Sequence, residues 1–270
     1  MPELPEVETT RLGITPWVHQ KKIIDVKIRE SRLRWPIPQS IRDNLINRTI
    51  LSVKRRAKYL LLETNHGSAI IHLGMSGSLR IIKDSEPAGK HDHFDIVFID
   101  GLALRFRDPR RFGSFLWSKN PLSHSLLNKL GPEPLESEFT AAYLWEKANK
   151  RKVTIKQFIM NAQIVVGVGN IYASESLFMA GINPKRQAGR ISKVRIVELV
   201  ISIKKILKQA IDAGGTTLQD FHTSDGGDGY FKAKLSVYDR KGKPCLSCIK
   251  PISMIVIGQR STFYCKYCQT

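Results

Sequence analysis

Four cysteines near the C-terminal end constrain this 270-residue chain more than any other feature. They form two Cys-x-x-Cys pairs, Cys245 with Cys248 and Cys265 with Cys268, and 16 residues separate the pairs. Each pair can supply two thiolates from one tight turn, and two such turns complete a tetrahedron around Zn²⁺. Two disulfides or four free thiols are the alternative interpretation. We expect one structural Zn²⁺, because four thiolates leave no position for a catalytic water.

The segment between the two pairs predicts a β-hairpin. Apolar or β-branched residues recur on both sides of Gly258, at Ile252, Met254, Val256, Thr262 and Tyr264. From residue 232 to residue 270 the chain has eight Lys or Arg and a single acid, Asp239. A small basic ribbon stapled by a metal is suited to presenting cations and backbone amides to phosphates.

The whole chain is strongly basic. It contains 43 Lys or Arg against 24 Asp or Glu, a formal net charge of +19. Such a surplus attracts polyanions, so we expect a nucleic-acid partner; an anionic membrane face and a merely solubilising surface are the alternatives. No stretch approaches the ~20 apolar residues of a membrane helix. The acidic, proline-containing start does not resemble a secretory signal, so we expect a cytoplasmic protein with reduced thiols.

Roughly the first 120 residues have the pattern of a β-rich domain. Apolar residues alternate at Phe94, Ile96 and Phe98 and again at Leu104 and Phe106, with glycine-marked turns between such runs. Several short strands at this spacing predict a sandwich or a barrel.

The pattern changes near residues 131–134, after which helices are predicted over 141–150, 153–162, 171–180 and 194–213. Asn170 is the expected N-cap of the third helix. The last helix has the clearest apolar stripe: Val197, Val200, Ile203, Leu207, Ala210 and Ile211.

The N-terminus carries a candidate nucleophile. We expect Met1 to be removed, because a small second residue permits trimming, and this exposes Pro2 as a secondary amine. An α-amino group titrates near pH 8, so a useful fraction is neutral near pH 7.5. Such an amine can attack a carbonyl-level carbon and form an iminium, and Glu3 beside it could shuttle a proton. An inert terminus with surface acids is the alternative.

Three further clusters could bind nucleic acid. Residues 54–59 (Lys-Arg-Arg-Ala-Lys-Tyr) place four cations beside a strand, although such a run can be a solvated face. Residues 108–113 (Asp-Pro-Arg-Arg-Phe-Gly) offer two Arg and a Phe on a turn that could wedge between bases, or could be an ordinary surface turn. Residues 167–170 (Gly-Val-Gly-Asn) precede a helix and could cradle a phosphate, although helix packing explains the two glycines equally well.

Five motifs occur in a fixed order along the chain: Met-Pro-Glu-Leu-Pro-Glu-Val-Glu-Thr at 1–9, His-Leu-Gly-Met-Ser-Gly at 72–77, Asp-Pro-Arg-Arg-Phe-Gly at 108–113, Gly-Asn-Ile-Tyr-Ala-Ser-Glu at 169–175 and the two Cys-x-x-Cys pairs. Together they resemble formamidopyrimidine-DNA glycosylase, the bacterial base-excision enzyme family for oxidised purines. The likeness runs from residue 1 to residue 270, with no departure at a catalytic position.

The resemblance implies an α+β protein. Its expected parts are a two-layer antiparallel β-sandwich with flanking helices over 1–134, a helical helix-two-turns-helix domain over 135–231 and a zinc β-hairpin over 232–270. The enzyme would act as a monomer on damaged double-stranded DNA, in the bacterial cytoplasm and associated with the nucleoid. The segment 214–230 would be a mobile loop that closes over a flipped base, or alternatively a linker.

The resemblance also implies a bifunctional DNA glycosylase and abasic-site lyase. Pro2 matches the nucleophile that displaces the damaged base and forms a Schiff base, and Glu3 matches the general acid. Lys58 matches the proton donor of β-elimination. Arg260 matches the arginine of δ-elimination and phosphate contact. The expected product is a one-nucleotide gap flanked by phosphates.

The same resemblance assigns DNA contacts. Met75, Arg110 and Phe112 match the side chains that fill the stack when the target base is flipped out, and Arg110 would bind the orphaned cytosine. Positions that match phosphate or nearby backbone contacts are His91, Arg151, Lys156, Asn170 and Tyr238.

Two other functions stay open at this stage. An endonuclease VIII-like glycosylase for oxidised pyrimidines belongs to the same superfamily, although Leu4 and the Arg-Arg-Phe turn favour the purine branch. A non-catalytic zinc-containing DNA-binding protein would need the basic ribbon but would have no use for a free N-terminal proline.

Overall fold

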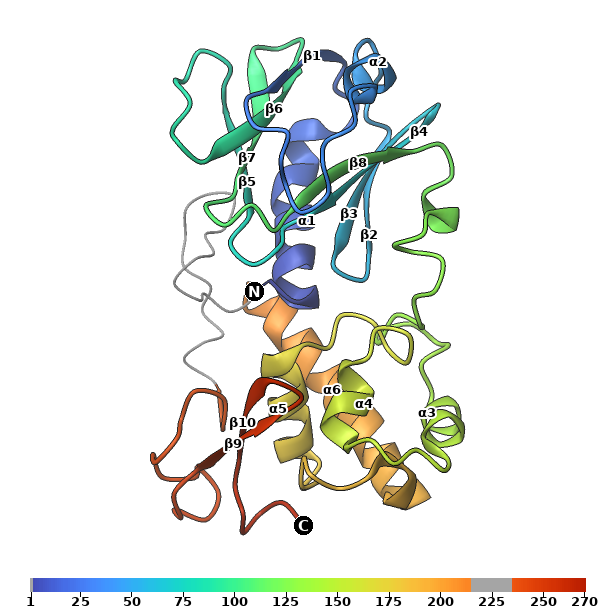
Figure 1. Ribbon diagram of the computed structural model, residues 1–270, viewed down its shortest axis with the longest axis vertical. Coiled ribbons are helices and arrows are strands. Elements are labelled where there is room, and N and C mark those ends of the chain that lie inside the picture. Colours follow the sequence, from blue (N-terminus) through green and yellow to red (C-terminus); the bar gives the residue numbers. More distant parts are fainter. Residues whose placement is uncertain (1, 215–234) are drawn as a thin grey trace. The chain divides into compact units, whose positions relative to one another are not determined.

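The computed structural model describes residues 2–214 and 235–270 (Figure 1). Two compact units are distinguished, one with residues 2–128 and the other with residues 129–213 and 235–270. In the described part of the chain, no helix is long and apolar enough to cross a membrane. The expected loop at 214–230 lies, apart from Gly214, outside the described residues.

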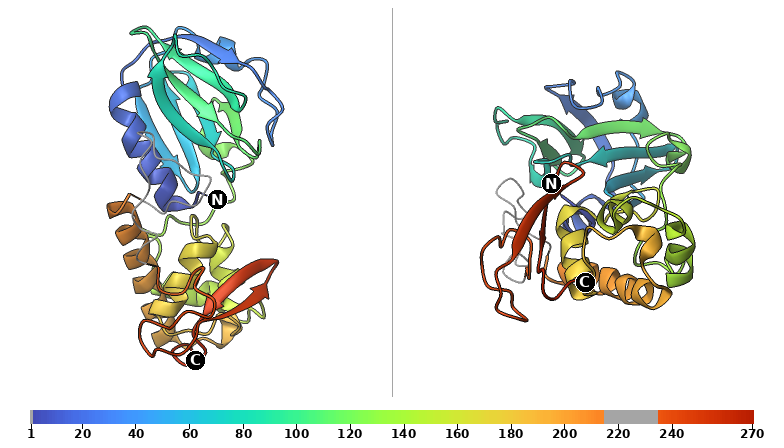
Figure 2. Two further views of the ribbon diagram at one scale, coloured as in Figure 1. Left: turned by 90° about the vertical axis from the view of Figure 1, so that its left-hand side faces the viewer. Right: turned by 60° about the horizontal axis from the view of Figure 1, so that its bottom comes forward.

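The first unit is a sandwich of two antiparallel four-stranded sheets, as the sequence predicts. One sheet has the order β1-β6-β7-β5 and the other β2-β3-β4-β8, and Figure 2 shows them as two layers. The strands are β1 (Ile23–Ile28), β2 (Ser52–Arg56), β3 (Tyr59–Thr64), β4 (Gly67–His72), β5 (Ser78–Lys83), β6 (Asp92–Phe98), β7 (Leu102–Arg107) and β8 (Ser114–Ser118). The helices are α1 (Leu4–Val18), α2 (Ile41–Leu45) and η1 (Pro121–Ser123).

Aromatic stacking joins the two sheets. Phe94 on β6 stacks on Phe106 of β7 at 4.9 Å and on Phe115 of the other sheet at 4.0 Å, measured between ring centroids. Offset ring pairs of this kind add to the free energy of apolar burial. All seven residues of β6 are buried, so its polar residues need partners inside the protein. Asp95 has one in Arg105, whose Nη2 lies 2.9 Å from its Oδ2.

Helix α1 begins at a capping box that periodicity did not reveal. The backbone N–H of Glu3 donates to Glu6 Oε2 at 2.8 Å, and Pro5 occupies the first turn, where its missing N–H costs nothing. The helix buries Leu4, Val7, Ile14 and Val18 and packs against β2, β3 and β5. The acidic, proline-containing N-terminal segment is therefore a helix docked on the sandwich.

The second unit contains α3 (Ala141–Ala148), α4 (Ile155–Met160), α5 (Asn170–Met179), η2 (Ala188–Arg190), α6 (Lys193–Asp212), β9 (Ser253–Ile257) and β10 (Arg260–Tyr264). The four predicted helices are present, with ends shifted by up to two residues. Two details of the prediction are wrong. Gly169 is the N-cap of α5 and Asn170 its first residue, and Val197 on α6 is 37% exposed. The buried face of α6 uses Ile196 and Leu199 instead.

Strands β9 and β10 form the expected antiparallel hairpin, with Ile257 paired to Arg260. Gly258 and Gln259 form the turn with φ of 55° and 60°, the left-handed values of a tight hairpin turn. Ile252 and Phe263 pack with Val237 and the cysteines in a small core, whereas Val256 is 69% exposed. The hairpin thus covers a core too small to stand without a further staple.

Candidate functional site

The four cysteines converge as the sequence predicts. Their Sγ atoms all lie within 4.8 Å of one another, with 3.8 Å from Cys245 to Cys268 and 3.4 Å from Cys248 to Cys265. A zinc tetrahedron with Zn–S bonds of about 2.3 Å has edges of about 3.8 Å, so the cluster fits Zn²⁺. Burial tends to raise the pKa of the Cys245 thiol, but hydrogen bonds from the amides of Ser247 and Cys248 contribute to a net lowering to about 7. Burial, with hydrogen bonds to neighbouring thiols, instead raises the pKa of Cys248 and of Cys268, so the cluster by itself favours a thiolate at Cys245 and opposes one at these two positions.

Two buried side chains that sequence analysis missed attach the zinc hairpin to the helices. Gln269 accepts from the amide of Cys265 at 2.8 Å and donates to the carbonyl of Ile182 at 2.9 Å. Glu175 on α5 accepts backbone N–H groups from residues 236–238 at 2.8–2.9 Å. Burial raises the pKa of Glu175, and the three amides act against that rise.

Lys156 on α4 connects three segments from inside the second unit. It is 1% exposed, and its Nζ donates to Asn170 Oδ1 at 2.6 Å, to Thr262 Oγ1 at 2.7 Å and to the carbonyl of Ser261 at 3.2 Å. Asn170 Nδ2 donates to the same carbonyl at 3.0 Å. The start of α5 and the start of β10 are therefore fixed to one ammonium group.

Arg260 and Arg151 both present exposed side chains in this unit. Arg260 opens β10 directly after the hairpin turn, and the turn lies so close to α4 that a Cβ on Gly258 would meet Gln157 Nε2 at 2.8 Å. Arg151 precedes α4, where its Nε donates to the carbonyl of Lys147 at 3.4 Å. Tyr238 lies at the base of the zinc hairpin, edge-on to Phe263 at 5.1 Å.

In the first unit, Pro2 and Glu3 are buried at the start of α1, where the helix N-terminus favours negative charge. Glu8 holds this helix to β2, with its Oε2 2.8 Å from Arg55 Nε. Burial acts to raise the pKa of Glu8, but hydrogen bonds from Arg11 and Arg55 lower it below its ordinary value. The ion pair therefore persists near neutral pH and couples the helix to the strand that leads to Lys58.

Lys58 lies in the tight turn between β2 and β3, next to Ala57, whose φ is +55°. Nearby, the ring of His72 lies 4.8 Å from that of Tyr59. Burial, and then the charge of Lys58, lower the pKa of His72 to about 4. His72 is therefore neutral at pH 7, and its Nδ1 accepts from the amide of Gly74 at 2.9 Å.

Met75, Arg110 and Phe112, which were predicted to act together, lie on two neighbouring turns of the first unit. Phe112 is 42% exposed, and Arg110 Cζ stands 5.0 Å from its ring centroid, a cation–π contact. A Cβ on Gly74 would meet the carbonyl carbon of Phe112 at 2.4 Å, so the two turns touch backbone to backbone. His91 joins them through its carbonyl, which accepts from the amide of Asp108 at 3.0 Å.

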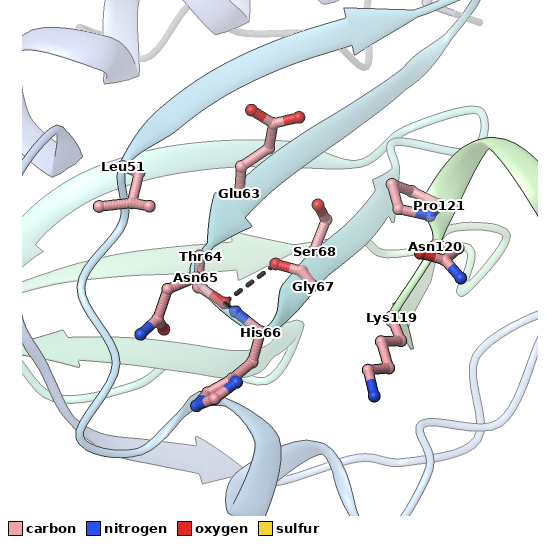
Figure 3. Close-up of a pocket in the computed structure, with 10 residues that line it drawn as sticks. All are labelled: Leu51, Glu63, Thr64, Asn65, His66, Gly67, Ser68, Lys119, Asn120 and Pro121. Carbon is pink, nitrogen blue, oxygen red and sulfur yellow. Dashed lines mark hydrogen bonds between the residues drawn. The ribbon is translucent and has the colours of Figure 1, made fainter.

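A cavity of about 460 Å³ opens at the turn between β3 and β4 (Figure 3). Its lining includes Glu63, His66 and Lys119, and none of the residues predicted from the sequence. Glu63 is engaged by Lys54 at 2.8 Å. The cavity is separate from the features described above and adds no group to them.

Comparisons with known proteins cover nearly the whole chain. Family models match residues 1–115 as the formamidopyrimidine-DNA glycosylase N-terminal domain, residues 130–222 as its H2TH domain, and residues 242–270 as the zinc finger found in FPG and IleRS. Formamidopyrimidine-DNA glycosylase of Nitrosococcus oceani is 55% identical over 270 residues, all of both chains. That of Aliivibrio fischeri is 54% identical over 269 residues, which are 100% of this chain and 98% of the relative.

Solved structures agree with these relatives. The MutM (Fpg) protein of Thermus thermophilus superposes with a TM-score of 0.90 at 33% identity, covering 99% of this chain and 98% of that one. Fpg of Lactococcus lactis, in a complex with DNA containing an abasic site, gives a TM-score of 0.91 at 32% identity and 99% coverage of both chains. The chain belongs to the formamidopyrimidine-DNA glycosylase family.

Proposed function

We propose that Pro2 is the nucleophile with which this DNA glycosylase excises oxidised purines, 8-oxoguanine and formamidopyrimidines, from duplex DNA in base excision repair. The observation that carries the proposal is the full-length identity to formamidopyrimidine-DNA glycosylases together with the Pro2-Glu3 pair at the start of α1. A mutant Fpg of Lactococcus lactis has been solved with DNA that contains Fapy-dG, and the wild-type protein with DNA that contains N7-benzyl-Fapy-dG. A secondary amine followed by a carboxyl is the pair of groups that iminium chemistry requires.

The proposed first step exchanges one bond at C1′ for another. The nitrogen of Pro2, free after removal of Met1, bonds to C1′ while the bond to the damaged base breaks and its electron pair leaves on the base. The nitrogen then loses its proton, its lone pair forms the C1′=N iminium and the C1′–O4′ bond opens. Glu3 shuttles that proton to O4′, which balances the step without an outside reagent.

Strand cleavage follows from the iminium, which acidifies the C2′ proton. In β-elimination that proton is lost to water, a C2′=C3′ double bond forms as the C3′–O bond breaks, and Lys58, as proton donor, gives a proton to the leaving phosphate. In δ-elimination the C4′ proton is lost to water, a C4′=C5′ double bond forms as the C5′–O bond breaks, and Arg260 contacts the phosphate that leaves. The exposed position of Arg260 at the hairpin turn supports this role, because a guanidinium there is free to pair with a phosphate in two hydrogen bonds.

Flipping the lesion leaves a gap in the stack that Met75, Arg110 and Phe112 fill in this proposal. The exposed ring of Phe112 can enter between bases, and the guanidinium held above it can donate to the orphaned cytosine. Extrusion costs a few kcal/mol, which such contacts offset.

Phosphate contacts are assigned to His91, Arg151, Asn170 and Tyr238. Lys156 has a different position, because its ammonium group donates to three acceptors inside the protein. We propose that Lys156 positions two parts of the DNA interface, Asn170 and the start of β10, from inside the protein. The enzyme is further proposed to act as a monomer, bound to the nucleoid in the cytoplasm, with the three-part division at residues 134 and 231.

Borohydride trapping tests the proposal. The unmodified protein is incubated with duplexes that carry 8-oxoguanine opposite cytosine, and reduction should leave a covalent protein–DNA adduct. Pro2→Gly should lose the adduct and base excision, because a primary amine of different geometry replaces the proline nitrogen. Pro16→Ala is the matched control, since Pro16 is an exposed proline of the same helix, and it should trap normally.

Absence of an adduct with the unmodified protein would refute the nucleophile. A duplex with thymine glycol opposite adenine separates the substrate classes in the same assay. Much faster cleavage of the glycol than of 8-oxoguanine would overturn the preference for oxidised purines.

A further inference from the structure

Asp108 is a buried carboxylate at the junction of the two turns that carry Met75, Arg110 and Phe112. Its exposure is 0%. Oδ1 accepts from the hydroxyl of Ser76 at 2.7 Å and from the amide of Arg110 at 3.3 Å, and Oδ2 accepts from the amide of Gly113 at 2.8 Å. One carboxylate therefore bridges the turn at 73–77 and both ends of the turn at 109–113.

The backbone of Asp108 extends the same junction to a third segment. Its N–H donates to the carbonyl of His91 at 3.0 Å, and its own carbonyl lies 2.6 Å from His93 Nε2. Arg111 closes the turn in a left-handed conformation with φ of +56°, and its guanidinium lies 3.2 Å from Glu30. The side chain of Arg111 is thus directed to Glu30, which leaves Arg110 as the arginine over Phe112.

The donors to this carboxylate are neutral groups, a hydroxyl and two amides. Burying a carboxylate among neutral donors costs free energy that an apolar residue of similar size would not cost. An ionised carboxylate accepts at both oxygens and never donates, so it suits a place where three donors converge. Its effect is to fix the relative position of two loops, because each bond is directional.

We infer that Asp108 is a positioning residue for base eversion, one that presets the three wedge side chains, and His91 with them, before DNA is bound. This inference rests on the proposed function, since it takes Met75, Arg110 and Phe112 as the wedge. A wedge must enter the stack with its loops already in place, because ordering them during eversion would add to the barrier. Asp108 itself would not touch the substrate.

Two variants separate the bonds. Ser76→Ala removes the hydroxyl that joins the two turns, which donates to Asp108 Oδ1 at 2.7 Å and accepts from the amide of Arg110 at 3.3 Å. Asp108→Asn preserves size but cannot accept at both ends. Asp100→Asn is the matched control, since it changes the same charge at an exposed turn where Asp100 pairs with Lys21 at 2.6 Å. Urea denaturation identifies any variant that fails to fold.

Each protein is given two duplexes, one with 8-oxoguanine opposite cytosine and one with a preformed abasic site. An abasic site has no base to unstack, so it depends less on the wedge. We expect Ser76→Ala and Asp108→Asn to slow 8-oxoguanine excision about tenfold or more, the factor of one hydrogen bond to a charged group. Strand cleavage and borohydride trapping at the abasic site should stay within about twofold of the unmodified enzyme in the same comparison.

A fluorescence measurement follows the unstacking of bases by Met75, Arg110 and Phe112 directly. The fluorescence of 2-aminopurine placed beside the lesion rises on unstacking, and this rise should be slower in both variants and unchanged in Asp100→Asn. Equal slowing on both duplexes would assign Asp108 to stability alone and overturn the inference, as would unchanged excision. An unmodified protein that excises nothing and forms no adduct would overturn the proposed function, and this inference with it.

Discussion

The close approach of the two wedge turns makes Gly74 a sharp test of the geometry. A Cβ built on Gly74 would lie 2.4 Å from the carbonyl carbon of Phe112, 2.5 Å from the nitrogen of Gly113 and 2.7 Å from the carbonyl oxygen of Phe112. All three atoms belong to the backbone, so no side chain can rotate away. Gly74→Ala must therefore move one turn relative to the other.

Gly101 provides a matched control. Its φ is +80° against +65° for Gly74, and a Cβ on it would meet nothing within 4 Å. Alanine in the left-handed region costs roughly 1–2 kcal/mol, and this term applies to both positions. Overpacking adds about 1–3 kcal/mol at Gly74 only. We expect the free energy of unfolding to fall by about 1–2 kcal/mol in Gly101→Ala and by about 2–5 kcal/mol in Gly74→Ala.

Urea denaturation measures the stability term, and 8-oxoguanine excision measured below the unfolding transition gives the functional term. Because Gly74→Ala displaces the backbone of Phe112, excision should slow well beyond any loss of folded protein, whereas Gly101→Ala should excise normally. Equal destabilisation by the two substitutions, with normal excision by Gly74→Ala, would refute the contact between the turns.

Further predictions concern acid, metal, a buried carboxylate and salt. Burial, and then the charge of Lys58, lower the pKa of His72 to about 4, below the value of 6.5 for an unfolded imidazole. The contribution of neutral His72 to the free energy of unfolding is therefore complete above pH 6.5 and is lost as the pH falls toward 4. The loss from pH 7 to pH 5 should be about 2 kcal/mol in urea denaturation, and His72→Asn, which cannot titrate, should lack it. Chelation or Cys245→Ser should unfold the zinc hairpin and abolish DNA binding in a gel-shift assay, and full activity of metal-free protein would contradict this. Glu175→Ala should lower the free energy of unfolding by about 3 kcal/mol or more and speed zinc release to a chelator, because three amides lose their acceptor. Affinity for lesion DNA should fall steeply with added salt, and a flat response would exclude phosphate neutralisation.

The sequence predicts the zinc site and a β-rich first domain because both depend on local patterns, whereas the family resemblance implied a sandwich rather than a barrel. Two ligands from each Cys-x-x-Cys turn are already neighbours, so only two turns need to meet. Alternation at Phe94, Ile96 and Phe98 is likewise a property of one strand. Helix α1 was not predicted from periodicity, because its sequence indicates a helix through the capping box of Glu3 and Glu6 rather than through a regular apolar stripe.

Burial that depends on partners distant in the sequence could not be predicted from the sequence. Ile196 and Val197 are equivalent in a periodicity count, and the packing of α3 and α5 on α6 decides that Ile196 is buried. Lys156 has the composition of a surface cation, yet its acceptors Ser261 and Thr262 lie more than a hundred residues away. Only the tertiary structure brings such partners together, so neither composition nor the family resemblance, which assigns Lys156 to a phosphate or nearby backbone contact, indicated that its side chain is buried.

In each unit, a buried charged side chain holds turns that carry proposed DNA contacts. Asp108 receives hydroxyl and amide donors from two turns, and Lys156 donates to the starts of α5 and β10. In both cases the charge is inside and the groups that would meet DNA are at its periphery. Charged hydrogen bonds are stronger and more directional than apolar contacts, which can slide. Substitutions at the two buried groups should therefore alter DNA processing without removing a contact to DNA, and losses of activity should be interpreted as changes in loop position.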